Sequence, residues 1–319
     1  MTTAFKWKYE AVAFDPTRIK DAIETDSTAD TDFCTIPNEA VVINSLNFKA
    51  NIKSSKSMKA SASGAKVQFY NCSDDTLFYL QRGNTLILRA GFEGQGELPL
   101  LLVGTITKSE TKRERADTLT TLTIQDSKYA KDNAPLGLSI PPNTFTYQQV
   151  IEALLKQAGK WGVPSEFVTQ EGIVTEVIKG GLTMEGELFR ELEKLCSSIQ
   201  YKVVYYLGRV RVEPKQFENS VQATVITPNN ILQGIHFHST TKGKSAKDTE
   251  QNEGITFTTF LNGGINLNGD IVNGIDLNTP IFADIAGYEG LYDPIEVEHK
   301  MEYEGQAWHT HVKTKRRPR

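Results

Sequence analysis

Apolar and polar residues alternate through much of the first third of the chain. In residues 46–52 (LNFKANI) every second side chain is apolar, which is typical of a strand with one buried face. Ser73 is expected to cap one helical turn that runs through Leu80. Apolar and β-branched runs predict further strands at 40–43, 67–70, 85–90, 100–107 and 118–124.

Two polar segments interrupt these strands. Residues 53–64 (KSSKSMKASASG) show no periodicity, so we expect a long, mobile loop there. Residues 108–117 (KSETKRERAD) can bury neither face, which predicts a solvent-exposed hairpin tip. A functional basic patch is the alternative, but Glu110, Glu114 and Asp117 reduce the net positive charge of this segment.

The period changes to that of helices in the middle of the chain. Thr146 stands three residues before Gln149, which predicts a capping box at a helix start. A second helix is expected after a cap at Thr183, and a hairpin about Gly208 should follow it. The predicted inward residues are Val150, Ile151, Leu154, Leu155 and Ala158 in the first helix, and Leu188, Phe189, Leu192, Leu195, Cys196 and Ile199 in the second.

The last third returns to strands, predicted at 231–238, 255–260, 281–285, 295–299 and 308–313. Between them, residues 262–278 alternate Ile, Leu and Val with Asn, Asp and Gly. A calcium-binding repeat needs a dense set of acidic oxygens, and here only Asp270 and Asp276 are present. A hairpin with Asn-Gly turns is therefore the favoured interpretation.

Composition and charge limit the classes of protein that remain. The chain has 319 residues, 39% of them hydrophobic, and a net charge of −4. This length predicts two or three domains, and the charge gives no general attraction to nucleic acid. Cys34, Cys72 and Cys196 lie far apart, which indicates neither a disulfide framework nor a zinc site. Neither a signal peptide nor a membrane span is expected, so we predict a soluble protein made in the cytoplasm.

The histidines are the candidate metal ligands. His236 and His238 form one HxH pair, and His309 and His311 form another. Both members of such a pair point the same way on a strand, so two adjacent strands could gather four imidazoles around zinc or iron. The alternative is half-exposed strand histidines beside a polar interface. We expect no metal and no cofactor, because no acidic partner is placed to orient the rings.

Catalytic motifs are missing from the sequence. It has no GxSxG elbow, phosphate loop, HExxH or dinucleotide fingerprint. Glu185 and Glu187 could act as a glycosidase acid pair on peptidoglycan, but carboxylates at a helix start usually meet the helix dipole. Cys196 is expected to be a small core residue rather than a nucleophile. We therefore predict that the chain is not an enzyme.

The basic C-terminus offers two interpretations. Its cations could contact nucleic acid, or they could hold an acidic neighbour in an assembly. They are Lys313, Lys315, Arg316, Arg317 and Arg319.

The order of these elements resembles the hub family that caps the tail tube of phages and of related injection particles. Residues 46–126 include VQFYNCSDDTLFYLQRGNTLILRAGFEG, LLLVGTITK and LTTLTIQD, in the order of the family's first tube-type barrel. Residues 290–317 (GLYDPIEVEHKMEYEGQAWHTHVKTKRR) look like the closing hairpin of its second barrel. The segments 262–278 and 108–117 match no family feature.

The resemblance implies a fold and a domain division. The expected fold is mainly β with an α+β insert, in which two tube-type β-barrel domains flank a small helix-helix-hairpin domain. The expected boundaries are 1–134 for the first barrel, 135–216 for the α+β domain and 217–319 for the second barrel.

The resemblance also implies a function. Hub proteins form a homotrimeric, pseudo-sixfold ring in the virion tail baseplate, which joins the tail tube to the central spike or tip and lines the DNA channel. The implied partners are a tail tube or distal tail protein above and a spike or tip protein below, with the tape measure protein as a further candidate. DNA is only transient channel cargo, and no membrane is involved. Two alternatives remain: a tail-tip module that binds host carbohydrate, and a tail-associated cell-wall hydrolase.

Overall fold

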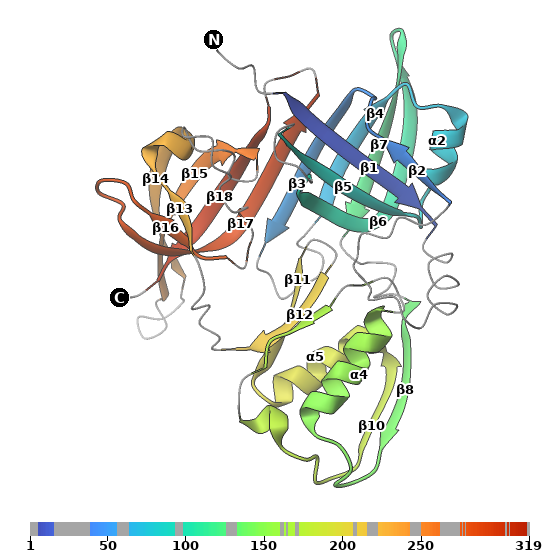
Figure 1. Cartoon of the computed structure of the whole chain (residues 1–319), viewed down its shortest axis with the longest axis vertical. Coiled ribbons are helices and arrows are strands. Elements are labelled where there is room, and N and C mark those ends of the chain that lie inside the picture. Colours follow the sequence, from blue (N-terminus) through green and yellow to red (C-terminus); the bar gives the residue numbers. More distant parts are fainter. Residues whose placement is uncertain are drawn as a thin grey trace.

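The computed structural model confirms that the protein is mainly β (Figure 1). Two β units flank a small α+β unit along the chain. The structure describes residues 6–15, 39–55, 64–92, 98–125, 133–159, 163, 165–169, 172–206, 209–215, 223–242, 250–261, 275, 277, 279–303, 305 and 307–317.

The first β unit contains all the strands predicted for the first third of the chain, with β1 in addition. In β3 the side chains of Phe48, Ala50 and Ile52 are buried and those between them are exposed, as the alternation predicts. Ser73 caps α2, because its side chain accepts a hydrogen bond of 3.2 Å from the backbone N–H of Thr76. The elements are β1 (Trp7–Phe14), β2 (Ala40–Ile43), β3 (Phe48–Ser55), β4 (Gly64–Tyr70), α2 (Asp74–Tyr79), β5 (Thr85–Phe92), β6 (Leu100–Glu114) and β7 (Asp117–Gln125).

β6 and β7 continue beyond their neighbours as a projecting hairpin (Figure 1). We call residues 108–117 the arm. Nearly all of its side chains are exposed, so the predicted solvent-exposed tip is confirmed. Its residues are strand almost to the end, with the turn at Arg115, where φ is 58°.

The α+β unit has the predicted helices and hairpin and further strands that we did not predict. A short pair of strands, β8 and β10, lies beside the helices, and β9 pairs in parallel with β12. The elements are β8 (Pro135–Ile140), α4 (Tyr147–Gly159), β9 (Ser165–Phe167), η2 (Ile173–Thr175), β10 (Leu182–Glu187), α5 (Leu188–Ser198), β11 (Tyr201–Tyr206) and β12 (Arg209–Pro214).

Of the two helix caps predicted in the α+β unit, one is confirmed and the other is wrong. The backbone N–H of Gln149 donates to Thr146 Oγ1 over 3.2 Å, and that of Thr146 donates to Gln149 Oε1 over 3.0 Å, which is a reciprocal capping box. Thr183 instead lies within β10, opposite Ser139. α5 begins only at Leu188, and its N-cap residue makes no side-chain cap bond.

The second β unit contains the strands predicted for the last third, most of them longer than expected. The elements are β13 (Thr224–Ile226), η3 (Pro228–Asn230), β14 (Ile231–Lys242), β15 (Glu250–Phe260), β16 (Ile281–Ala283), β17 (Gly290–Glu302) and β18 (His309–Arg316). The predicted hairpin at 262–278 lies outside the described residues except for Ile275 and Leu277, which are buried. The centre of the predicted loop at 53–64 and Cys34 also lie outside them.

Strands of both β units belong to one 13-stranded sheet. Its main path runs β14-β15-β18-β17-β3-β4-β7-β6-β5-β1-β2, and every neighbouring pair along it is antiparallel. The two units are joined where residues 296–302 of β17 pair with residues 49–55 of β3. This pairing connects the last part of the chain to the first within a single protein molecule.

Each unit has its own apolar core, and the cores of the two β units are separate clusters. The first unit's core includes Phe48, Phe69 and Leu122 together with Met301 and Trp308 from the second unit. The second unit's core includes Ile255, Phe257, Tyr292, Val297 and Val312. The α+β core contains all the inward residues predicted for the two helices.

A row of buried polar side chains separates the two β cores. Thr259 of β15, Thr310 of β18 and His299 of β17 are cross-strand neighbours, and each is at most 4% exposed. His299 Nδ1 and Thr310 Oγ1 lie 2.8 Å apart and share a hydrogen bond. On β17, Val297 belongs to the second core and Met301 to the first. The row therefore lies at the boundary between the two cores.

Candidate assembly surface

The side of the sheet that faces away from the cores carries polar residues across both β units. Because side chains alternate along a strand, the residues between the buried ones of each strand share this side, which we call the front face. It comprises Lys49, Asn51 and Lys53 of β3, Asp293, Glu296, Glu298, Lys300 and Glu302 of β17, His309, His311, Lys313 and Lys315 of β18, Arg317 just after β18, Thr256 and Thr258 of β15, and His236 and His238 of β14.

Ion pairs cross the junction between the two units on this face. Lys49 Nζ lies 2.5 Å from Glu302 Oε1, and Lys53 Nζ lies 2.8 Å from Glu296 Oε1. All four side chains are about a third to a half exposed, so each pair contributes at most about 1 kcal/mol. Their chief effect is to fix which residues of β3 and β17 face one another.

Glu298 lies between these pairs on β17. Burial alone would raise the pKa of its carboxyl group, but a hydrogen bond from Asn51 and the charge of Lys300 outweigh burial and lower the pKa. Lys300 Nζ lies 3.5 Å from Glu298 Oε2. Glu298 is therefore a carboxylate at neutral pH, and it is balanced by cations of its own chain.

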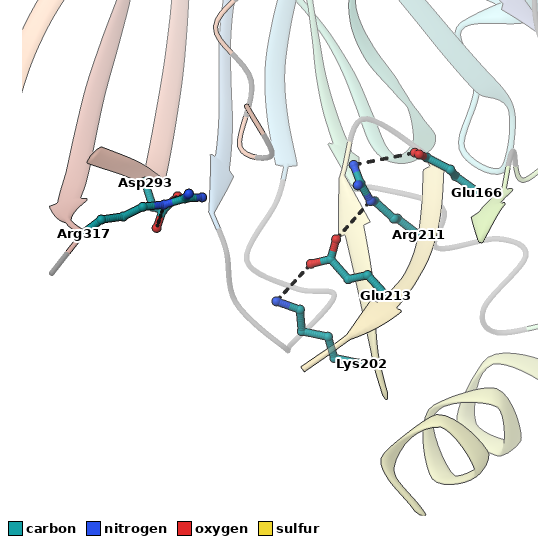
Figure 2. Close-up of polar contacts among 6 residues, drawn as sticks. All are labelled: Glu166, Lys202, Arg211, Glu213, Asp293 and Arg317. Carbon is teal, nitrogen blue, oxygen red and sulfur yellow. Dashed lines mark hydrogen bonds and ion pairs between the residues drawn. The ribbon is translucent and has the colours of Figure 1, made fainter. Parts of the chain in front are cut away.

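The end of β18 is fixed to β17 by an arginine-carboxylate pair (Figure 2). Arg317 Nε lies 2.9 Å from both carboxylate oxygens of Asp293, and its Nη2 lies 2.8 Å from Oδ1. Such multiple contacts orient both side chains. Arg317, one of the C-terminal cations, thus binds a carboxylate of its own chain.

The two HxH pairs lie on the front face but not on adjacent strands. β15 runs between β14 and β18, so the two pairs are not on adjacent strands, as a metal site shared by four imidazoles would require. His238 Nδ1 shares a 3.1 Å hydrogen bond with Thr256, and His311 Nδ1 shares one of the same length with Thr258. Threonines of β15 thus separate the imidazoles.

The surroundings of His238 and His309, one histidine of each pair, favour the uncharged imidazole. Burial and the charge of Lys313 lower the pKa of His238. Burial and the charge of Lys300 lower the pKa of His309. Within the described parts of the chain, no three side chains of His, Cys, Asp or Glu gather as metal ligands would.

A second set of charges lies in the α+β unit, on strands β9, β11 and β12 (Figure 2). Arg211 Nε lies 3.0 Å from Glu213 Oε2, and its Nη1 lies 3.7 Å from Glu166 Oε2. Lys202 Nζ lies 2.9 Å from Glu213 Oε1. The side chains of Glu213 and Arg211 are only 6% and 12% exposed, so the central pair of this chain is largely removed from water, whereas the Glu166 side chain is 56% exposed.

These charges lie on the side of the β11–β12 hairpin that faces the second β unit. Lys202 and Val204 are two residues apart on β11 and so lie on the same side of the hairpin. Val204 packs against the core of the second β unit. The charged side of the hairpin is thus the side that meets the second β unit. We did not predict these four charged residues, although the alternation of Lys202, Arg211 and Glu213 with buried valines indicates one shared polar face.

The predicted catalytic candidates do not converge. Glu185 and Glu187 are exposed on β10, on either side of Gly186, whose φ is 116°. Cys196 is buried in the core of the α+β unit. Burial, followed by the charge of Glu193, raises the pKa of its thiol to about 12, so Cys196 remains a protonated core side chain.

The arm is anchored close to its turn by Asn71. This residue has φ of 55°, and its side chain donates to Asp117 Oδ1 and accepts from the backbone N–H of Thr118, both over 2.9 Å. Thr111 and Thr120 share a further hydrogen bond of 3.1 Å across the hairpin. The arm is therefore an ordered projection.

Among the described helices, none is long and apolar enough to span a membrane.

Solved structures of tail proteins share this fold. A tail protein from Neisseria meningitidis MC58 matches with a TM-score of 0.56 at 10% identity, over 86% of this chain and 93% of that one. The 43 kDa tail protein of prophage MuSo2 from Shewanella oneidensis matches with a TM-score of 0.55 at 9% identity, over 86% and 94%. A chain of the half-lidded Francisella PdpA-VgrG complex also reaches 0.55 at 6% identity, over 98% of this chain and 58% of that one.

No family model and no curated protein matches the sequence. The structural matches extend over most of this chain and, for the two bacterial tail proteins, over most of theirs. The resemblance inferred from the sequence is thus confirmed at the level of the fold: this chain has the fold of phage tail proteins.

Proposed function

We propose that this chain is a structural baseplate hub protein of a phage tail. Three copies form a pseudo-sixfold ring, which joins the tail tube to the central spike or tip and surrounds the channel for DNA. The β17–β3 junction carries this proposal, because it makes two β units into one continuous wall within a single chain. Three such chains place six β units in a ring, which matches a sixfold tube to a threefold partner.

The front face suits the wall of a channel through which DNA passes. Its acidic residues Asp293, Glu296, Glu298 and Glu302 all pair with cations of the same chain. The face carries six lysine and arginine charges against these four carboxylates, so most of its charge is neutralised and only a small positive excess acts on a passing polyanion. In this proposal the front face lines the channel, and the α+β unit and the arm contact the tail components above and below.

The proposal includes no catalytic role. The carbohydrate-binding alternative would favour exposed aromatic side chains in a concave site. Trp7 and Trp308 instead stack with ring centroids 5.3 Å apart and pack with the first unit's core. The remaining tryptophan, Trp161, lies outside the described residues.

Light scattering of the purified chain tests the proposal. We expect a particle with three times the 35.5 kDa mass of one chain, either alone or after addition of the neighbouring tail tube protein. A chain that stays monomeric in both conditions would contradict the proposal. So would reproducible digestion of host cell wall in a zymogram, if Glu185→Gln or Glu187→Gln abolished it.

A further inference from the structure

The positive excess of the front face is concentrated on one strand. Four of its six lysine and arginine side chains each form an ion pair with a carboxylate of the face, at Asp293, Glu296, Glu298 or Glu302. The other two are Lys313 and Lys315 of β18. Within the described part of the chain, neither forms an ion pair with a carboxylate. The uncompensated charge of the face therefore lies on β18.

Histidines extend these two lysines into a strip. On β18 the half-buried front-face residues alternate with buried threonine and valine, and they are His309, His311, Lys313 and Lys315. Side chains on one face of a strand recur about every 6.6 Å, so these four span about 20 Å. His236 and His238 of β14 lie on the same face across β15. We call these six residues the basic strip.

The strip is continuous across β15, because that strand places no charged side chain on the front face between β14 and β18. Its front-face residues there are Gly254, Thr256 and Thr258. A Cβ atom on Gly254 would lie 3.0 Å from Cε1 of His238, so the imidazole occupies space that a side chain would fill. His238 also hydrogen-bonds the backbone of Thr314 on β18.

β17 supplies the charged groups that face the strip. Its register places Lys300 next to His309, and Glu298, Glu296 and Asp293 next to His311, Lys313 and Lys315. Each of these carboxylates is already paired with a cation outside the strip, at Lys300, Lys53 and Arg317 respectively. They therefore border the strip without neutralising it.

We propose that the basic strip binds a phosphodiester chain, and that its histidines make this binding stronger at acidic pH. The inference rests on the proposed function, in which the front face lines the DNA channel, and it adds the place of contact and its regulation. Histidine side chains gain a proton as the pH falls from about 8 to about 5. Full protonation of the four imidazoles would add four charges to those of Lys313 and Lys315, and each cation that contacts a phosphate releases counterions.

The direction of the pH effect follows from linkage. The pKa values of His238 and His309 are lowered by burial and by the neighbouring lysines, so these imidazoles are uncharged at neutral pH. A bound phosphate group stabilises the imidazolium and raises its pKa in the complex. The added affinity is therefore present at acidic pH and is lost as the pH rises through the pKa of the complex.

The shape of the strip favours a uniformly charged chain over an acidic peptide. Its cationic and titratable groups recur at a regular spacing, and no exposed apolar side chain stands among them as an anchor for a peptide. Phe237 is 51% exposed, but it lies between His236 and His238 on β14 and so on the opposite side of the strand.

Fluorescence anisotropy with a labelled single-stranded oligonucleotide tests the inference at constant salt. Between about pH 7.5 and about pH 5.5 we expect the affinity of the unmodified protein to rise about tenfold or more. The combined variant His236→Gln, His238→Gln, His309→Gln and His311→Gln should bind like the unmodified protein at the higher pH and lose this rise. His299 is buried and has a pKa of about 4, so it does not titrate in this range.

Two lysine variants locate the site. Lys313→Gln combined with Lys315→Gln should weaken binding about tenfold at both pH values, because two phosphate contacts are lost. Lys112→Gln combined with Arg113→Gln removes two cations from the exposed arm, and it should bind like the unmodified protein. Circular dichroism should show that all variants are folded.

Three results would overturn the inference. They are equal affinity of the unmodified protein at both pH values, an unchanged rise in the histidine variant, and a loss of binding in the arm variant rather than in the strip variant. Poly-glutamate that displaces the oligonucleotide at an equal concentration of charge would show an acidic-peptide site instead. The assay needs no ring, so its failure leaves the hub function standing, whereas a chain that never assembles contradicts the hub function alone.

Discussion

His299 is a buried, neutral imidazole between two apolar cores. Burial lowers its pKa to about 4, and its Nδ1 shares a hydrogen bond with Thr310. In the unfolded chain a histidine has a pKa of about 6.5. The unfolded state therefore takes up this proton first as the pH falls.

We predict an acid-sensitive contribution to stability from His299. This contribution to the free energy of unfolding amounts to about 3 kcal/mol. It is fully present above a pH of about 6.5 and is lost as the pH falls toward about 4. Thermal unfolding of the wild type and of His299→Gln, followed from neutral pH down to the folded-state pKa, measures it. The carboxylates titrate in both proteins, so the difference between their curves isolates His299. Curves that run parallel over this range would contradict the prediction.

Glu213 is the central anion of the ion-pair chain in the α+β unit. Glu213→Gln would leave Arg211 and Lys202 without their common counter-charge, and Arg211 is largely buried. We expect a loss of stability of about 3 kcal/mol, measured by urea unfolding. The control is Glu110→Gln in the exposed pair with Lys108, which should unfold like the wild type. If both variants unfolded alike, the Glu213 chain would have no special role.

At the scale of elements, the apolar faces of α4 and α5 hold the α+β unit together. Leu154 and Leu192 are at most 1% exposed. Leu154→Asp and Leu192→Asp each bury a charge at a cost of several kcal/mol, so we expect each to unfold this unit. Ala153→Asp, at an exposed position of α4, serves as the control. Melting temperatures and solubility are the measurements, and unchanged values for both leucine variants would refute the role of these faces.

The arm can be shortened without touching the core. Lys112 and Leu119 face one another across the hairpin, so Asn-Gly in place of residues 113–118 gives a two-residue turn in register. We expect a folded chain with slightly reduced stability, because Asn71 loses its partners Asp117 and Thr118. Incorporation into tails, measured by complementation, should fall. Normal incorporation would mean that the tip contacts no tail component.

Local patterns in the sequence predicted elements with a clear period or cap. The alternation around Phe48 predicted β3, and the spacing of Thr146 and Gln149 predicted the start of α4. Thr183 misled the prediction, because a threonine before an apolar helix face satisfies the cap pattern even when it lies in a strand. β1 was not predicted, although its buried residues Tyr9, Ala11 and Ala13 alternate, because two of these three are alanines, which give only a weak strand signal.

At the scale of the whole molecule, sequence patterns gave the two β units but not their junction. The pairing of β17 with β3 joins residues from opposite ends of the chain, and no local period encodes such a partner. The same reason explains the histidines. The HxH spacing correctly predicts that both members of a pair lie on one face, but it cannot show that β15 separates the two pairs.

Electron microscopy of the assembled chain tests the hub function most directly. The purified protein, alone or with the tail tube protein, should form rings with threefold symmetry, an open centre and six similar lobes. Monomers, filaments or closed twofold dimers in both conditions would contradict the account.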